Sequence, residues 1–125
     1  MKNAIFGEIS PLSDKDCFTV FSRLKNAFTY PIHTHDNIYE LNFIENAAGA
    51  RRVVGDSVEE IGYLELTLIT GHALSHAWLN NNKKFKDIKE ITIQFHADLL
   101  NHDLLERNQF KSVKDMFEKA KCGVT

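Results

Sequence analysis

The sequence has few of the residues that mark zinc, redox or nucleic-acid-binding proteins. Its two cysteines, Cys17 and Cys122, lie far apart and match no zinc or redox spacing. Isolated thiols of this kind are typical of a reduced, cytoplasmic protein. Lys and Arg number 15 against 17 Asp and Glu, so the chain lacks the basic surplus of a nucleic-acid-binding domain. We therefore expect that this chain does not itself contact DNA.

Signals for secretion and for membrane insertion are also missing. The N-terminal residues Met1–Ile9 lack the long apolar core of a signal peptide. The longest central stretch without Asp, Glu, Lys or Arg runs from Leu66 up to Lys83, and it contains two histidines and several polar residues. Such a stretch is unlike a membrane span. The 125 residues suffice for one domain with a real core and are too few for two.

Short strands separated by turn residues dominate the chain as far as about Phe95. Glycines and the run Asn80-Asn81-Asn82 mark the turns. Regular short strands with frequent turns predict a mainly β protein, an antiparallel sandwich or barrel. The expected strands are Cys17–Arg23, Phe28–His35, Tyr39–Glu45, Ala50–Gly55, Ser57–Ile61, Glu65–Thr70, His76–Leu79 and Ile88–His96.

The period becomes helical after the last strand. Residues 98–106 predict one short helix, and Ser112-Val-Lys-Asp115 resembles a capping box that starts a second. Gly123 is the expected stop of this second helix. Its apolar residues recur at helical spacing and form one stripe, which packs either on the chain's own sheet or on a second copy. The stripe consists of Val113, Met116, Phe117 and Ala120.

The most informative stretch is His33-Thr-His35, followed by Glu40 and, much later, His76. Because side chains alternate along a strand, His33 and His35 point to the same side. Three imidazoles and a carboxylate converging inside a β-barrel suit a divalent transition metal such as Fe, Mn, Ni or Zn. They equally suit a polar small molecule held by hydrogen bonds. We expect no obligatory cofactor and keep the metal site as the alternative.

Further residues favour a polar metabolite, sugar-like or carboxylated. Trp78 shares its strand parity with His76, and an indole face stacks on the apolar face of a sugar. Arg51 and Arg52 alternate, so one of them points inward, and we assign Arg52 to hold a carboxylate or a vicinal diol. Gln94 both donates and accepts hydrogen bonds. The predicted ligand-binding residues are His33, His35, Glu40, Arg52, His76, Trp78 and Gln94.

These motifs resemble the cupins, and among them the N-terminal sensor domain of AraC-type bacterial transcription regulators. The first cupin motif is matched by His33, His35, Glu40 and Gly49. The AraC-type pattern is matched by Tyr39–Leu41, Arg52–Asp56, Leu66–Ile69, His76–Trp78, Ile93–Phe95 and Phe110–Gly123. In the second cupin motif Ala73 stands where glycine is usual, and many AraC-type domains have proline at the position of Ser75. That departure weakens an enzymatic interpretation more than it weakens the fold.

The resemblance implies a cupin-like antiparallel β-barrel (a double-stranded β-helix or jelly roll) over residues 17–97. Residues 1–16 would form an arm or lid, and residues 98–125 a helical dimerisation or linker segment. The domain would bind a small effector and form a homodimer through its C-terminal helix. DNA would be bound only by a helix-turn-helix domain outside this chain, and we expect the sequence to represent the sensor part alone. The alternative is a stand-alone metal-dependent cupin enzyme, a dioxygenase or an isomerase.

Overall fold

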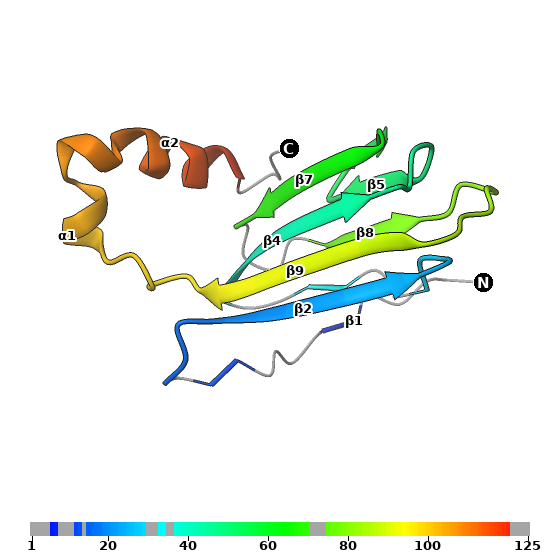
Figure 1. Ribbon diagram of the computed structural model, residues 1–125. Helices are drawn as coiled ribbons and strands as arrows, with labels where there is room; N and C mark the ends of the chain where they lie inside the picture. The colour runs from blue at the N-terminus through cyan, green and yellow to red at the C-terminus, as the bar shows by residue number, and fades with distance from the viewer. Residues whose placement is uncertain are drawn as a thin grey trace.

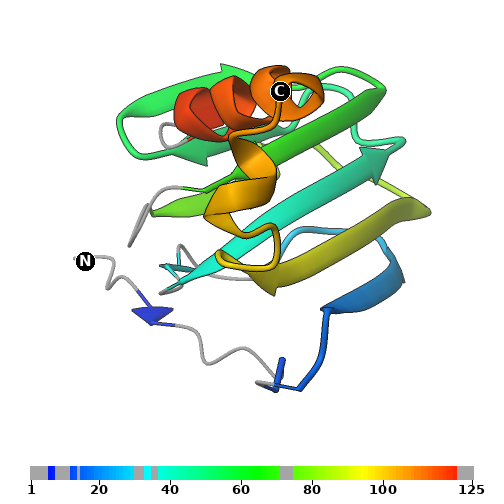
Figure 2. The ribbon, with the colours of Figure 1, turned by 90° about the vertical axis from the view of Figure 1, so that its left-hand side faces the viewer.

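Two β-sheets and a short helical segment make up the structure. The computed structural model describes residues 6–7, 12–13, 15–29, 33–34, 37–70 and 75–120. Within them the chain is mainly β, its strands pair antiparallel apart from one short pair, and the helices follow the last strand. In Figure 1 the helices lie at one end of the sheets, and Figure 2 views the molecule from that end. The predicted class, mainly β with a C-terminal helix, is confirmed.

One sheet has four strands and is antiparallel throughout. Its order is β2-β9-β4-β7, so the last long strand lies between the first and the third. We call it the four-stranded sheet. Its strands are β2 (Phe18–Lys25), β9 (Ile88–His96), β4 (Ile38–Glu45) and β7 (Leu64–Ile69).

The second sheet has the order β1-β3-β8-β5-β6, and we call it the five-stranded sheet. Only β1 and β3 pair in parallel. The pairing aligns Arg52 with Trp78 and Val54 with His76, so these four side chains share the face toward the other sheet. The strands are β1 (Phe6–Gly7), β3 (His33–Thr34), β8 (His76–Leu79), β5 (Arg51–Val54) and β6 (Ser57–Glu60).

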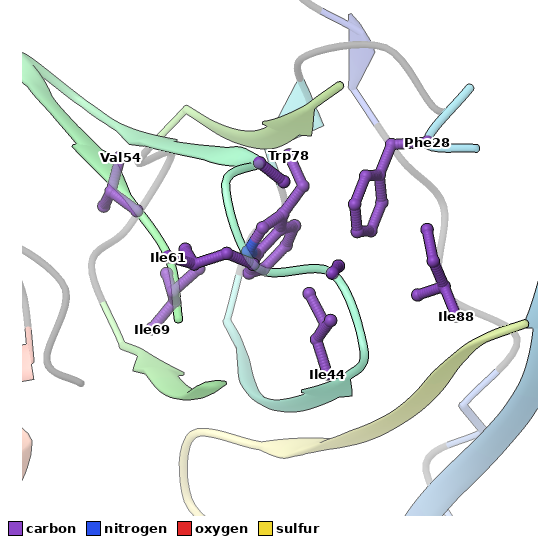
Figure 3. Packing of buried hydrophobic residues seen from close by; sticks show 9 residues of the cluster. Phe28, Ile44, Val54, Ile61, Ile69, Trp78 and Ile88 are labelled. Carbon is purple, nitrogen blue, oxygen red and sulfur yellow. The ribbon is translucent and has the colours of Figure 1, made fainter. Parts of the chain in front are cut away.

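An apolar core lies between the two sheets (Figure 3). Ile44 and Ile88 come from the four-stranded sheet, Val54 and Trp78 from the five-stranded sheet, and all are buried. Alternation along each strand places these residues on the inner face. The Trp78 ring lies in the middle of the cluster, with Phe28 on one side of it.

The closed barrel implied by the resemblance is not found among the described residues. Hydrogen-bonded pairing stops at β2 and β7 in one sheet and at β1 and β6 in the other. A barrel requires an unbroken ring of paired strands, whereas these strands form two facing sheets. The expected strand Phe28–His35 is reduced to β3, because Phe28 and Thr29 are not in a strand and residues 30–32 and 35 lie outside the described ones.

The helical segment is more broken than its sequence period predicts. Helix α1 (His102–Leu105) is capped by Asn101, whose side chain accepts a hydrogen bond of 2.8 Å from the N–H of Leu104. A 3-10 turn, η1 (Asn108–Phe110), then runs directly into α2 (Lys111–Lys119). The predicted capping box at Ser112 is wrong, because α2 grows out of the preceding turn and has Phe110 at its N-cap without a side-chain hydrogen bond. The expected stop at Gly123 lies outside the described residues.

The apolar stripe of α2 packs on the chain's own four-stranded sheet. The Phe117 ring lies 5.3 Å from the ring of Tyr39 and 6.5 Å from that of Phe95, both measured between centroids. The N–H of Thr70 donates to the carbonyl of Ala120 at 3.1 Å, and Ala120 is fully buried. Met116 is 41% exposed and is the residue of the stripe that lies most open to solvent.

No helix among the described residues is long and apolar enough to cross a membrane.

We predict that the ion pair between Glu106 and Lys114, which joins α1 to α2, contributes to stability only in a defined pH window. The hydrogen bond and the charge of Lys114 lower the pKa of Glu106 from its ordinary value of 4.5, and the hydrogen bond to Glu106 raises the pKa of Lys114 from 10.5. The contribution is therefore complete between about pH 4.5 and pH 10.5. It disappears as pH falls through the lowered pKa or rises through the raised one.

Thermal unfolding of Glu106→Gln beside the unaltered chain measures this effect. The variant melts slightly lower at pH 7 and equally at pH values well below 4.5, and added salt shrinks the difference because the pair is exposed. Glu60→Gln, at an exposed position of β6, is the control and shows no such pH dependence. A difference that persists unchanged in acid would contradict the assignment.

Candidate functional site

The inner face of the four-stranded sheet is polar over much of its area. Glu40 and Asn42 on β4, and Glu90, Thr92 and Gln94 on β9, are all buried between the sheets. Apart from the charged Lys89, their neighbours between Tyr39 and Phe43 and between Ile91 and Phe95 are apolar or aromatic and point outward, which is the reverse of the usual arrangement. Burying polar groups is unfavourable unless hydrogen bonds satisfy them, so the partners of these side chains define the site.

A cavity of about 190 Å³ lies against this polar face. Arg23 and Thr29 in its wall are exposed, so the cavity opens to solvent there. Three aromatic rings and several hydrogen-bonding groups therefore surround one space. The lining residues are Phe21, Arg23, Lys25, Phe28, Thr29, Glu40, Asn42, Ala77, Trp78, Glu90, Thr92 and Gln94.

One set of polar contacts is centred on Glu40, which lines the cavity, whereas His76 does not. Gln94 Nε2 donates to Glu40 Oε1 at 3.2 Å, and His76 Nε2 lies 3.2 Å from the other oxygen, Oε2. The His76 ring meets Trp78 edge-on, with centroids 6.3 Å apart. Three separate strands thus bring Glu40, Gln94 and His76 together, and the carboxylate of Glu40 contacts a residue of the other sheet.

A second set of polar contacts is centred on Glu90. Lys25 Nζ lies 2.6 Å from Glu90 Oε1, and Asn42 Nδ2 donates to Glu90 Oε2 at 3.3 Å. Thr92 Oγ1 in turn donates to Asn42 Oδ1 at 2.6 Å. Each oxygen of this carboxylate therefore has a partner. The ammonium of Lys25 also lies 5.0 Å from the centre of the Phe28 ring, which fixes one wall of the cavity.

Phe28 is held in that wall by the side-chain amide of Asn80. The N–H of Phe28 donates to Asn80 Oδ1 at 2.8 Å, and Asn80 Nδ2 donates to the carbonyl of Phe28 at 3.0 Å. This pair of hydrogen bonds replaces the strand pairing that Phe28 lacks. Asn81 and Asn82, which follow, have φ values of 57° and 59°, as expected for the predicted turn.

Arg52 points inward, as predicted, yet it does not line the cavity. Its guanidinium pairs with Glu65, which is buried, and with Glu59 at 2.7 Å. Both carboxylates belong to strands next to β5 or facing it. Both NH2 groups of the Arg52 guanidinium are thus paired with carboxylates. The structural role of Arg52 is therefore to connect β5 to β6 and β7.

The predicted metal ligands are brought together only in part. Glu40 and His76 are in contact, and the backbone of β3 pairs His33 with His76. The side chain of His33 and all of His35 lie outside the described residues. In the described part of the chain no group of three potential ligands is close enough to hold an ion. The four-ligand metal site therefore stays a prediction.

Several cavity residues were missed from the sequence, chiefly Asn42, Glu90, Thr92 and Lys25. The signal for three of them was present: Asn42 has the strand parity of Glu40, and Glu90 and Thr92 have that of Gln94. A strand that carries an inward Glu40 carries its other polar residue of the same parity inward too. The pairing of Lys25 with Glu90 has no such signal, because it depends on the register between β2 and β9.

Comparisons with models of protein families, with curated proteins and with solved structures found no match for this chain.

We predict that Lys25 is required chiefly to neutralise Glu90. In Lys25→Met the Glu90 carboxylate, with 8% of its side chain exposed, loses its cation, and the free energy of unfolding falls by about 1–3 kcal/mol. The loss is smaller than for a fully buried pair because 22% of the Lys25 side chain is exposed. Adding Glu90→Gln to Lys25→Met recovers part of this loss, since no unpaired charge then remains.

Urea unfolding of the two single variants and the double variant measures the coupling as a double-mutant cycle. Lys84→Met, at an exposed position, is the control and changes the free energy of unfolding by less than about 0.5 kcal/mol. Strictly additive losses in the cycle would show that Lys25 and Glu90 do not depend on each other.

Proposed function

We propose that this chain is the effector-binding domain of an AraC-type transcription regulator, with a cupin-type jelly-roll fold and a small polar metabolite as its ligand. The observation that carries the proposal is the 190 Å³ cavity between the sheets, in which Glu40, Asn42 and Gln94 present hydrogen-bonding groups beside aromatic rings. A concave site with a few convergent polar groups is the usual form of a small-molecule site.

The strand order supports the finer fold assignment. If β2 to β9 are numbered one to eight, the four-stranded sheet has the order 1-8-3-6. The other sheet, without β1, has the order 2-7-4-5. A jelly roll likewise has eight strands in two sheets that are built from two Greek keys, and the cupins belong to this class, so the strand order supports the proposed fold.

The dimensions of the cavity favour a ligand of about one six-membered ring. A cavity of about 150 Å³ is known to hold benzene, and this one is somewhat larger at 190 Å³. Its carboxylates accept hydrogen bonds from hydroxyl groups, its amides of Asn42 and Gln94 both donate and accept, and Trp78 offers an apolar ring face. Arg23 at the open side suits a carboxylate. A monosaccharide or a small hydroxy acid fits this combination.

Ligand binding is linked to the helices because cavity residues and the residues that contact α2 are direct neighbours along β4 and β9. Tyr39, which precedes Glu40 on β4, and Phe95, which follows Gln94 on β9, lie on the outer face. Phe117 of α2 packs against the rings of Tyr39 and Phe95. A ligand that pulls Glu40 and Gln94 therefore moves the residues on which α2 rests. Such a ligand shifts the population of helix positions, and an attached DNA-binding domain responds.

Two expected partners stay predictions. DNA binding through a separate helix-turn-helix domain is one of them. Homodimer formation through the C-terminal helix has less apolar surface to use than its sequence suggests, because Phe117 and Ala120 pack on the chain's own sheet and Met116 is left exposed.

The metal-dependent enzyme is the second candidate, and the contact between Glu40 and His76 is the observation in its favour. Two of the four expected ligands are thereby adjacent. Elemental analysis after purification without chelators tests it: about one Fe, Mn, Ni or Zn per chain that is lost in His76→Ala would support the enzyme.

We predict that monosaccharides or small hydroxy acids, screened singly, raise the melting temperature of the domain. A ligand at about one hundred times its Kd adds about 2.7 kcal/mol of stability, which corresponds to roughly 10 °C for a domain of this size. Glu40→Gln, which turns a double acceptor in the cavity wall into an amide, reduces the affinity at least roughly tenfold.

The matched control is Glu59→Gln, because Glu59 is a largely exposed carboxylate and does not line the cavity. It leaves ligand affinity unchanged. If no compound of either class stabilises the chain, or if Glu40→Gln and Glu59→Gln respond to ligand alike, the cavity is not the effector site.

A further inference from the structure

The outer face of the four-stranded sheet is an almost continuous apolar surface. The strand registers arrange its side chains in rows across the sheet. One row is Val20, Ile93, Leu41 and Leu68, and the next is Ser22, Ile91, Phe43 and Leu66. We call this face, with Phe18, Leu24 and Leu64 at its margins, the outer apolar face. It is the reverse side of the strands that carry the polar cavity.

Much of the outer apolar face is open to solvent. Phe18, Val20, Leu24, Leu64 and Leu66 are each exposed over at least half of their surface. Taking about 200 Å² for a fully exposed large side chain, these residues alone offer on the order of 500 Å². Monomeric proteins rarely expose a larger apolar patch. The half-buried residues of the two central rows bring the total toward the roughly 800 Å² per partner of a standard interface.

The helices in the described part of the chain cover only one end of this face. Phe117 of α2 rests on Tyr39 and Phe95, in the row next to Val20 and Ile93. Figures 1 and 2 show the described helices gathered at that end, with the remaining length of the four-stranded sheet uncovered by them.

We propose that a second copy of this chain covers the outer apolar face, so that two four-stranded sheets pack against each other. This inference is independent of the ligand proposed for the cavity. Facing sheets pack about 10 Å apart with their strands nearly aligned. A two-fold axis along the strands places β9 of one copy over β4 of the other, and the same patch then serves both copies.

The charges at one end of the face fit this arrangement. The row beyond Ser22 contains Lys89 on β9 and Glu45 on β4, which are direct neighbours in the sheet. When β9 lies over β4 of a second copy, each Lys89 meets a Glu45 and each Glu45 meets a Lys89. In the same registration Ile91 packs on Phe43, an apolar pair. An unrelated apolar partner would not match this exchange of charges.

The test is the association state of the 125-residue chain, measured by sedimentation equilibrium over a range of concentrations. We expect a mass of twice the chain's 14.3 kDa. Val20→Lys and Leu66→Lys, on opposite edge strands of the outer apolar face, raise the dissociation constant at least roughly tenfold. Thermal melting confirms that each variant is folded, which is expected because both positions are half exposed.

Two control variants locate the interface. Val58→Lys makes the same substitution at a comparably exposed valine on β6 of the five-stranded sheet, and it leaves the dimer intact. Met116→Lys tests the alternative interface on α2 and also leaves the dimer intact. A chain that stays monomeric at all concentrations overturns the proposal. So does a dimer that Met116→Lys dissociates while Val20→Lys does not, or one that Val58→Lys weakens equally.

A measurement on the unaltered chain gives an independent check. In a sample that mixes isotope-labelled with unlabelled copies, filtered nuclear Overhauser spectra report contacts between copies only. Contacts of the Ile91 methyl groups with the Phe43 ring of another copy support the proposal, and their absence in a dimeric sample refutes it.

Discussion

The structure depends on the need to satisfy polar side chains that are buried between two sheets. Glu40 and Glu90 each place a carboxylate in the interior, where an unpaired charge is strongly unfavourable. Each is stabilised by residues from other strands: Glu40 by Gln94 and His76, and Glu90 by Lys25 and Asn42. These contacts join β2 to the centre of the four-stranded sheet, and they join that sheet to β8 of the five-stranded sheet. A slip of one residue in the register would turn these groups to the opposite face, so the polar contacts help to select the register together with apolar packing.

The polar interior has a consequence for the outer surface. Since alternate residues of a strand lie on opposite faces, an inward Glu40, Asn42 and Gln94 require that their apolar neighbours face outward. Part of that apolar surface receives α2, through Phe117 against Tyr39 and Phe95. The rest is free of the described helices and needs another cover to avoid contact with water. The cavity and the outer apolar face are therefore two results of one alternating pattern along β4 and β9.

The strands could be predicted from the sequence because their residues alternate in polarity, and β8 and β9 have the predicted bounds. Which face lies inward could not be read from alternation alone. An inward Glu40 places its neighbour Tyr39 outward and Asn42 inward, yet the sequence prediction included neither Asn42 nor Glu90 among the site residues.

Arg52 was placed inward correctly, but the two carboxylates that hold it come from separate strands and their approach depends on how the sheets face each other. The start of α2 was misplaced because the preceding 3-10 turn leaves no conventional N-terminus for Ser112 to cap. The local sequence pattern thus predicts the secondary-structure elements, whereas the site is formed by contacts between strands that are distant in the sequence.

The same alternation makes the proposed ligand and the proposed second copy thermodynamically coupled. Glu40, Asn42 and Gln94 face the cavity, while Leu41, Phe43 and Ile93 stand between or beside them on the outer apolar face. A ligand that draws β4 and β9 closer changes the spacing of both faces at once, since each strand is a single backbone. If a ligand strengthens association, association must strengthen binding of the ligand by the same factor, because both cycles share one coupling free energy. On these two proposals, the strands β4 and β9 connect ligand binding with assembly, and α2 packs on the outer rings of the same two strands.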